Sequence, residues 1–186
     1  MGRIVVTEFV SLDGVMEDPG GSESWTSGFD TGEGFNEFKM DETMRSEALL
    51  LGRVTYELFA GSWPSEEGEF ADKFNGLPKY VVSSTIENPS WGDTRVLRGV
   101  EEVSKLRQEA AGDLVVHGSA QLAQALIEHD LVDELRLMVY PVVAGSGKRL
   151  FGETSTRKRF GLADTKLLGA GVAVLIYRPL VEAGRA

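Results

Sequence analysis

The chain has 186 residues, and its 29 acidic and 19 basic residues give a formal net charge of −10 at pH 7. Because neutralising phosphates requires surplus Lys and Arg, this balance counts against a general binder of nucleic acid or anionic membrane. A small phosphate-bearing ligand held by one or two local cations stays compatible with it. The absence of cysteine excludes disulfides, thiolate metal sites and a cysteine nucleophile, and two histidines cannot form a three-histidine zinc site.

The start of the chain carries no signal-peptide pattern, and no apolar run is long enough to span a bilayer. We therefore expect a cytoplasmic protein. The length predicts one domain over residues 1–186. We expect no metal site, no membrane partner and no nucleic-acid partner.

The apolar pattern predicts strands that alternate with helices along the first three quarters of the chain. The Gly-rich, acidic segment from Glu17 to Gly34 is a long loop, and such loops are usually functional or mobile. The predicted elements are, in chain order, a strand at 4–10, a helix from Phe35 to near Glu47, a strand at 48–51, a helix at 54–60, strands at 79–84 and 95–97, a helix at 100–110, a strand at 113–117, a helix opened by Gly118, a strand at 135–140 and a hairpin of strands at 160–167 and 172–177.

The run at 48–51 is continuously apolar, which is typical of a strand buried on both faces of a parallel sheet. The last quarter is mostly strand. We therefore predict an α/β fold, with a mostly parallel central sheet, helices on both faces and an antiparallel hairpin at the C-terminus.

Some glycine-rich segments invite familiar interpretations that the residues do not support. The run from Gly145 to Lys148 fails the phosphate-loop pattern, because Val142 stands where its first glycine belongs and Arg149 stands where Ser or Thr must bind magnesium. Gly169-Ala170-Gly171 precedes a strand instead of a helix, so it is no dinucleotide fingerprint. No nucleophile elbow G-x-S-x-G is present.

Two predicted strand-to-helix junctions do point to a ligand site. In one, Gly52 follows a buried strand and Arg53 opens a helix; in the other, Gly118 and Ser119 follow His117. Helix N-termini offer free N–H groups to anions, and the carboxyl ends of parallel strands are where α/β sheets bind ligands. The segment 83–85, Ser-Ser-Thr, adds hydroxyls at the end of another strand.

Each of these residues also has a structural interpretation. Gly52 and Gly118 can be ordinary turn glycines, and Arg53 a solvated cation. Ser119 can be an N-cap, and His117 a hydrogen-bonded core histidine. Asp13 precedes Gly14 and is first of all a turn residue. The coincidence of three junctions favours the functional interpretation.

In this order, the motifs resemble the dihydrofolate reductase-like superfamily, and most closely the C-terminal reductase domain of bacterial bifunctional riboflavin-biosynthesis deaminase/reductases. The resemblance covers residues 2–178. It rests on Ser11-Leu12-Asp13-Gly14, Leu51-Gly52-Arg53-x-Thr55-Tyr56-Glu57, Val82-Ser83-Ser84, Val116-His117-Gly118-Ser119 and the segment from Pro141 to Phe151. It implies a dihydrofolate reductase-like three-layer fold, an NADPH cofactor and a homodimer.

The resemblance also implies roles for individual residues. The cofactor phosphates would be held by Gly52, Arg53 and Thr55, and the adenosine 2′-phosphate would lie near Ser83, Ser84 and Thr85. The helix after His117 would present backbone N–H groups to the pyrophosphate, from Gly118, Ser119, Ala120, Gln121 and Leu122, and His117 itself is a cofactor-binding candidate. Asp13 is the first candidate for positioning the substrate or relaying a proton, and Glu37 is the second.

The sequence departs from dihydrofolate reductase itself at one position. Counting back from Gly52 places Asn36 near the position of the acidic pterin-binding residue, with Glu37 beside it, and this counts against folate as substrate. We expect an NADPH-dependent reductase that transfers hydride to a small polar heterocycle or a ribosyl-pyrimidine, as in 5-amino-6-(5-phosphoribosylamino)uracil reductase of riboflavin biosynthesis. The alternatives are a catalytically silent nucleotide-binding or sensing protein, a cofactor-free interaction module, and dihydrofolate reductase proper.

Overall fold

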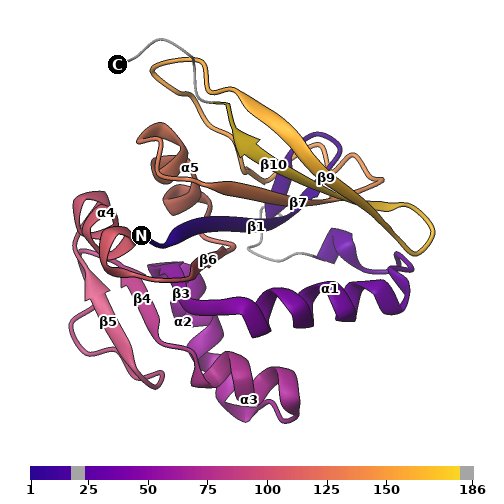
Figure 1. Ribbon diagram of the computed structural model, residues 1–186. Coiled ribbons are helices and arrows are strands. Elements are labelled where there is room, and N and C mark those ends of the chain that lie inside the picture. The colour runs from indigo at the N-terminus through magenta and orange to yellow at the C-terminus, as the bar shows by residue number, and fades with distance from the viewer. Residues whose placement is uncertain (18–23, 181–186) are drawn as a thin grey trace.

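The computed structural model describes residues 1–17 and 24–180. Its centre is an eight-stranded sheet with the strand order β5-β4-β3-β6-β1-β7-β10-β9 (Figure 1). The strands of this sheet are β1 (Arg3–Ser11), β3 (Ser46–Gly52), β4 (Lys79–Val82), β5 (Thr94–Leu97), β6 (Asp113–His117), β7 (Glu134–Tyr140), β9 (Phe160–Leu168) and β10 (Val172–Pro179). Two short strands, β2 (Val15–Glu17) and β8 (Lys148–Arg149), pair with each other beside it.

The pairing from β5 to β7 is parallel throughout, while β10 pairs antiparallel with both β7 and β9. In Figure 1 the β9–β10 hairpin forms one edge of the sheet. The predicted parallel sheet with a C-terminal antiparallel hairpin is therefore confirmed. Parallel pairing also brings the carboxyl ends of β3, β4 and β6 to one side of the sheet.

Helices cover both faces of the sheet, which confirms the predicted three-layer arrangement. Residues of α4 and α5 share one apolar core with β1, β3 and β6, whereas α1, α2 and α3 contribute to cores on the other face. The helices are α1 (Gly32–Arg45), α2 (Arg53–Ser62), α3 (Glu69–Gly76), α4 (Val100–Glu109) and α5 (Ala120–Glu128), with short 3-10 turns at Ser24–Thr26 and Trp63–Ser65.

Strand β3 lies in the middle layer, and both of its faces are covered. Leu50 packs into the core under α4 and α5, whereas Leu49 and Leu51 pack with Tyr56 of α2 and Phe74 of α3. All three leucines have no exposed surface. The continuous apolar run in the sequence is thus explained by burial on both faces.

Some element boundaries differ from those predicted. The strand expected at 79–84 ends at Val82, because the Ser83 hydroxyl accepts the backbone N–H groups of Thr85 and Ile86 and turns the chain. The helix expected from Phe35 begins earlier, at Gly32, and ends at Arg45. Helix α3 and strands β2 and β8 were not predicted; all are short. Part of the predicted loop 17–34, residues 18–23, lies outside the described residues.

Candidate functional site

A cavity of about 680 Å³ opens where β3, β4 and β6 end. It is bordered by the N-termini of α2 and α5 and by the turn after β4. Its lining residues are Glu17, Gly52, Arg53, Val54, Thr55, Val82, Ser83, Ser84, Thr85, Val100, Ser119, Ala120, Gln121, Leu122, Ala125 and Lys148. The fold therefore brings the three predicted segments together around one space.

The first wall of the cavity is the N-terminus of α2. Gly52 is its N-cap residue, in an extended conformation, and no side chain caps the helix. The first N–H groups of α2 are therefore left for solvent or a ligand, at the positive end of the helix dipole. Arg53 is half-exposed and pairs with Glu57 one turn along the helix at 2.8 Å. A pair this exposed is weak, so the guanidinium can turn toward an anion in the cavity.

The second wall is the N-terminus of α5, which begins with an unusual backbone. Gly118 and Ser119 have φ values of 54° and 60°, both in the left-handed region, and α5 also lacks a side-chain cap. A Cβ on Gly118 would lie 3.0 Å from the Thr55 hydroxyl oxygen, so the two helix starts touch here. The glycine thus permits both the left-handed turn and the close approach. Successive N–H groups in such a turn form a concavity suited to anions.

Hydrogen bonds fasten the two walls to each other. The Gly52 N–H donates to the Ser119 hydroxyl oxygen at 2.9 Å, and the Ser119 N–H donates to the Thr55 hydroxyl oxygen at 2.9 Å. The Ser119 hydroxyl in turn donates to the His117 carbonyl at 2.9 Å. Thr55 and Ser119 therefore hold the two helix N-termini in fixed positions relative to each other.

The third wall is the hydroxyl-bearing turn after β4. Ser84 and Thr85 are exposed, whereas Ser83 is buried beneath them. A cation that the sequence analysis did not single out stands behind this turn: Arg98 donates from a terminal nitrogen to the Ser83 carbonyl at 2.9 Å. The turn thus combines hydroxyl donors with a nearby guanidinium, which suits a phosphate.

Sequence reasoning also missed two charged lining residues, Glu17 and Lys148, which form an ion pair at 2.7 Å. They come from the paired strands β2 and β8, which are far apart in the chain. Lys148 lies in the segment 145–148, whose sequence does not match the phosphate-loop pattern. No local pattern indicates that β8 would fold back to the cavity mouth.

His117 and Gly118 lie at the end of β6 but do not line the cavity. The His117 ring lies on the opposite face of the sheet, edge-on to Phe74 at 5.6 Å between centroids. Burial, together with the nearby charges of Lys39 and Arg136, lowers the pKa of His117 to about 3, against the opposing effect of Glu42. The imidazole is therefore neutral at physiological pH, and its contacts are those of a core residue.

Asp13 joins the end of β1 to the loop after β7, outside the cavity. Its two carboxylate oxygens accept the backbone N–H groups of Ala144 at 3.0 Å and Gly145 at 2.9 Å, and the Ser11 hydroxyl donates to it at 2.7 Å. The hydrogen bond from Ser11 and those from the backbone lower its pKa to about 2. Asp13 is thus an ionised clamp on this loop. Glu37 lies exposed on α1 and does not line the cavity.

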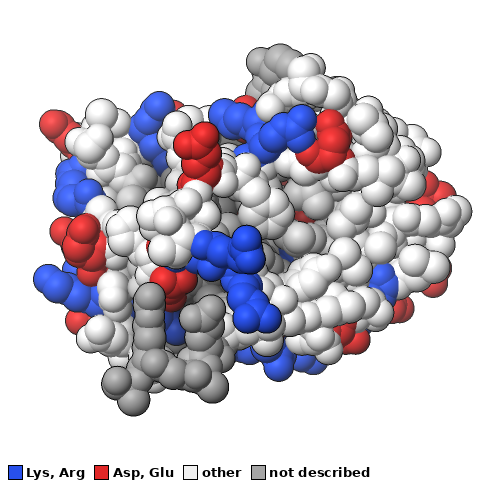
Figure 2. All heavy atoms as spheres, turned by 90° about the horizontal axis from the view of Figure 1, so that it is seen from above, with Lys and Arg blue, Asp and Glu red and all other residues white. Residues whose placement is uncertain are grey.

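On the face shown in Figure 2, basic and acidic side chains lie next to one another, and neither sign covers the described surface. No group of three or more His, Asp or Glu side chains in residues 1–17 and 24–180 is arranged to hold a metal ion. Within the same ranges, no helix has both the length and the apolar character needed to cross a bilayer.

These features, a mostly parallel three-layer α/β fold with a cavity at its strand ends, are shared with known proteins. A family model described as the RibD C-terminal domain matches residues 3–174, and the chain belongs to this family. The chain is 31% identical over 184 residues to the uncharacterized protein YyaP of Bacillus subtilis (strain 168), covering 94% of both chains. It is 30% identical over 173 residues to the uncharacterized protein YwjB of the same organism, covering 91% of this chain and 94% of YwjB.

Solved structures share the fold at lower sequence identity. A putative riboflavin biosynthesis protein from Shewanella sp. PV-4 matches with a TM-score of 0.76 and 20% identity over 96% of this chain and 99% of that one. A deaminase/5-amino-6-(5-phosphoribosylamino)uracil reductase from Thermotoga maritima matches with a TM-score of 0.66 and 18% identity, over 96% of this chain and 57% of that one. Dihydrofolate reductase from Enterococcus faecalis, complexed with NADP(H) and RAB-propyl, matches with a TM-score of 0.60 and 17% identity, over 96% of this chain and 97% of that one. The fold is therefore dihydrofolate reductase-like, as the sequence predicts.

Proposed function

We propose that the protein is an NADPH-dependent reductase that transfers hydride to a small polar heterocycle or a ribosyl-pyrimidine. The observation that carries the proposal is the cavity itself, in which two uncapped helix N-termini and a turn of hydroxyl groups converge. Two of the structural neighbours bear titles that name a reductase, and one of them names NADP(H).

The residues of the cavity fit a dinucleotide with three phosphate groups. Its volume of about 680 Å³ is in the usual range for sites that hold small molecules and cofactors. Gly52 leaves the backbone open at the cavity, and a Cβ there would lie 3.4 Å from the Ser119 side chain, whereas Gly118 lies outside the lining and admits Thr55 instead. In the proposal, Arg53, Thr55 and the first N–H groups of α5, at 120–122, donate to phosphate. Gly52 and the segment 118–119 shape the cavity, because the N–H groups of Gly52 and Ser119 already donate to side-chain oxygens.

The preference for NADPH over NADH would come from the turn after β4. Ser83, Ser84 and Thr85 surround the expected position of the 2′-phosphate, and Arg98 adds a cation bonded to the Ser83 carbonyl. A hydroxyl-rich turn beside a guanidinium favours the extra phosphate, whereas the 2′-hydroxyl of NADH would gain little from the charge.

When bound, the nicotinamide would supply the hydride, and the protein would orient the reactants and exclude water. In the proposal, Asp13 positions the substrate through the loop that it clamps, because its carboxylate is ionised and already accepts two backbone N–H groups. Glu37, exposed on α1, stays the second candidate for supplying a proton. A homodimer, which the resemblance implies, and a cytoplasmic location are part of the same proposal.

The alternatives make different predictions about the same cavity. A silent nucleotide-binding or sensing protein would bind NADPH without turnover of any substrate. Dihydrofolate reductase proper would turn over dihydrofolate, although Asn36 and Glu37 lie exposed on α1. A cofactor-free module would bind neither nucleotide.

The test is a titration of the full chain with NADPH and with NADH, followed by tryptophan fluorescence and by heat. We expect saturable binding that prefers NADPH and that weakens about tenfold or more in Arg53→Ala, since a charged hydrogen bond is lost. Arg95→Ala, which removes an exposed guanidinium on β5, serves as the matched control. Failure of both nucleotides to bind at millimolar concentration would refute the reductase proposal.

A further inference from the structure

A second cavity, of about 350 Å³, lies at the opposite end of the sheet from the first. It is enclosed by the second half of α1, the amino ends of β1 and β7, and the β9–β10 hairpin. Five basic and four acidic side chains line it together with Phe38 and Ile176: Arg3, Arg45, Arg136, Lys166 and Arg178, and Asp41, Glu42, Glu134 and Asp164. The basic side chains outnumber the acidic ones by one here, in a chain whose net charge is −10.

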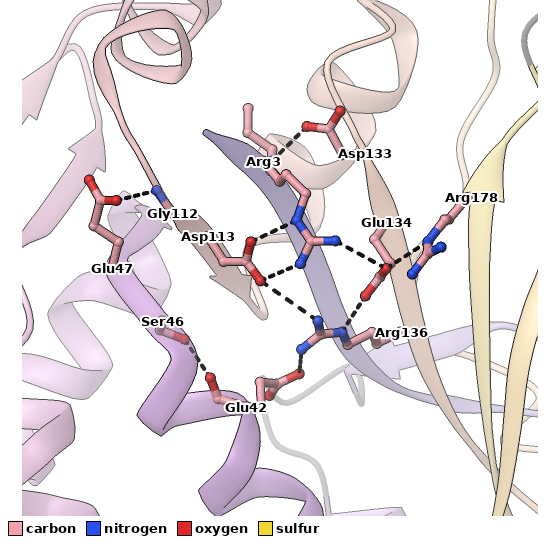
Figure 3. Close-up of polar contacts among 11 residues, drawn as sticks. Arg3, Glu42, Ser46, Glu47, Gly112, Asp113, Asp133, Glu134, Arg136 and Arg178 are labelled. Carbon is pink, nitrogen blue, oxygen red and sulfur yellow. Dashed lines mark hydrogen bonds and ion pairs between the residues drawn. The ribbon is translucent and has the colours of Figure 1, made fainter. Parts of the chain in front are cut away.

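The inner part of this cavity is an ion-pair network in which the carboxylates are fully engaged (Figure 3). The Glu134 carboxylate accepts hydrogen bonds from Arg136 at 2.8 Å and from Arg178 at 3.0 Å. A terminal nitrogen of Arg3 lies 3.6 Å from the same carboxylate. Glu42 pairs with Arg136 at 3.2 Å and with Lys39. Both carboxylates are almost fully buried, so their negative charges are balanced by these partners and do not face the cavity mouth.

The basic groups at the mouth of the cavity keep donors to spare. Arg178 is 62% exposed, and only its Nε donates to a described residue, which leaves its two terminal nitrogens open. Lys166 is exposed; its ammonium lies 5.5 Å from the centre of the Phe38 ring, and it forms no ion pair with a described residue. Arg3 donates from Nε and from one terminal nitrogen to Asp113, at 2.8 Å and 2.7 Å. Its other terminal nitrogen lies 3.6 Å from Glu134, beyond hydrogen-bond distance, and is the part of Arg3 that stays available.

The acidic groups at the mouth offset this positive charge only in part. Asp41 pairs with Arg45 at 2.8 Å on the surface of α1. The Asp164 carboxylate accepts the backbone N–H of Thr165 at 2.8 Å and keeps its negative charge, which balances one of the two cations Arg178 and Lys166. Because a guanidinium has five N–H donors in a fork that matches planar oxyanions, the unused donors of Arg178 and Arg3 define where an anion would bind.

We propose that this cavity is a second ligand site, which binds a compact multivalent anion through Arg178, Lys166 and Arg3. Phe38 and Ile176 provide an apolar floor for the carbon part of the ligand. A polycarboxylate and a phosphate ester share this chemistry. The site is separate from the proposed cofactor cavity and does not depend on the proposed function.

An occupant of this site would be joined to the other end of α1 through the network. Arg136 forms part of the cavity wall and also bonds Glu42, which holds Lys39 5.9 Å from the centre of the Phe9 ring. Phe9 in turn contacts Phe35 at the start of α1, at 5.9 Å. Binding therefore stabilises the packing of α1 on the sheet, and we expect it to raise the melting temperature.

The experiment is calorimetric titration of the full chain with citrate and with inorganic phosphate at constant ionic strength. We expect saturable binding at one site, which Lys166→Gln and Arg178→Gln each weaken about tenfold, because each removes a charged donor. Lys105→Gln, an exposed lysine on α4, is the matched control and should bind as the wild type does. Binding of citrate alone would identify a polycarboxylate site, and binding of phosphate alone a phosphate-ester site.

Arg53→Ala separates the two cavities, because phosphate could also enter the first one. Binding that is unchanged in Arg53→Ala and about tenfold weaker in Lys166→Gln supports the proposal. The proposal is overturned if Arg53→Ala abolishes binding, or if Lys105→Gln weakens binding as much as Lys166→Gln does. It is also overturned if the wild type binds neither anion. Thermal melting checks that each variant is folded; if Arg178→Gln is not, Lys166→Gln decides alone, since Lys166 has no ion pair among the described residues to lose.

Discussion

The backbone N–H of Gly52 donates to the side-chain oxygen of Ser119 at 2.9 Å, across 67 positions of the sequence. Gly52 ends β3 and occupies the N-cap position of α2, while Ser119 occupies the N-cap position of α5 after β6; neither side chain caps its helix. This bond therefore ties together the two helix N-termini that face the larger cavity. The spacing of the two sets of N–H groups depends on it.

Replacing Ser119 tests this connection. Ser119→Ala leaves the Gly52 N–H without its acceptor, and we expect a loss of about 1–2 kcal/mol in the free energy of unfolding. Ser119→Gly loses the same hydroxyl but relieves the left-handed backbone at φ 60°, so we expect a smaller loss by about 1 kcal/mol. Urea denaturation of the three proteins measures the difference. Equal stability of wild type and Ser119→Ala would contradict a role for the bond.

Arg98 is expected to discriminate between the two nicotinamide cofactors. Its guanidinium bonds the Ser83 carbonyl, beside the hydroxyl-bearing turn. Arg98→Ala should weaken NADPH binding about tenfold and leave NADH binding nearly unchanged, because only NADPH carries the 2′-phosphate. Parallel fluorescence titrations measure both affinities. If Arg98→Ala weakened the binding of NADPH and NADH equally, Arg98 would only stabilise the turn and would not recognise the 2′-phosphate.

Asp13→Asn is expected to loosen the loop after β7. The carboxylate accepts the N–H groups of Ala144 and Gly145, and an amide cannot accept with both of its polar atoms. The variant should therefore unfold at a lower urea concentration than the wild type at neutral pH. If turnover of a substrate is unchanged with the cofactor bound, Asp13 has no part in the reaction.

The same variant has a defined pH dependence. The pKa of Asp13 falls from 3.8 to about 2 in the folded protein, so its stabilising contribution is complete above the unfolded value and is lost as the pH falls through the folded one. The stability gap between wild type and Asp13→Asn should therefore narrow between pH 4 and pH 2. A gap that stays constant over this range would mean that the charge of Asp13 is not what holds the loop.

His117 is expected to make the protein less stable in mild acid. Its pKa is lowered from 6.5 to about 3, so between these values the unfolded chain binds a proton that the folded one does not. Stability conferred by the neutral ring is complete above pH 6.5 and declines toward pH 3. We expect His117→Gln to lose less stability than wild type from pH 7 to pH 4.5 in urea denaturation, relative to its own value at pH 7. His129→Gln, an exposed position, is the matched control.

The predicted cofactor residues illustrate what local patterns contain. Gly52, Arg53 and Ser119 could be selected because a glycine after a buried strand, followed by a helix start, is visible in the sequence. Lys148 and Arg98 could not, because no residue near them in the sequence indicates that Lys148 lines the cavity or that Arg98 bonds the Ser83 carbonyl. His117 was grouped with its neighbours in the sequence, yet strand alternation turns its ring to the other face of the sheet, against Phe74.

The sequence by itself determined the alternation of the longer strands and helices, the strand buried on both faces, the antiparallel ending and the glycines at the strand ends, but not the short elements α3, β2 and β8. These follow from periodicity and backbone conformation, which act over a few residues. Only the tertiary structure decided the second cavity and the partners of Asp13 and Glu134. Such contacts join segments up to 136 positions apart, as between Asp13 and Arg149. The energy of such a contact depends on the distance between the two groups and on their burial. Neither quantity follows from the residues next to them in the sequence.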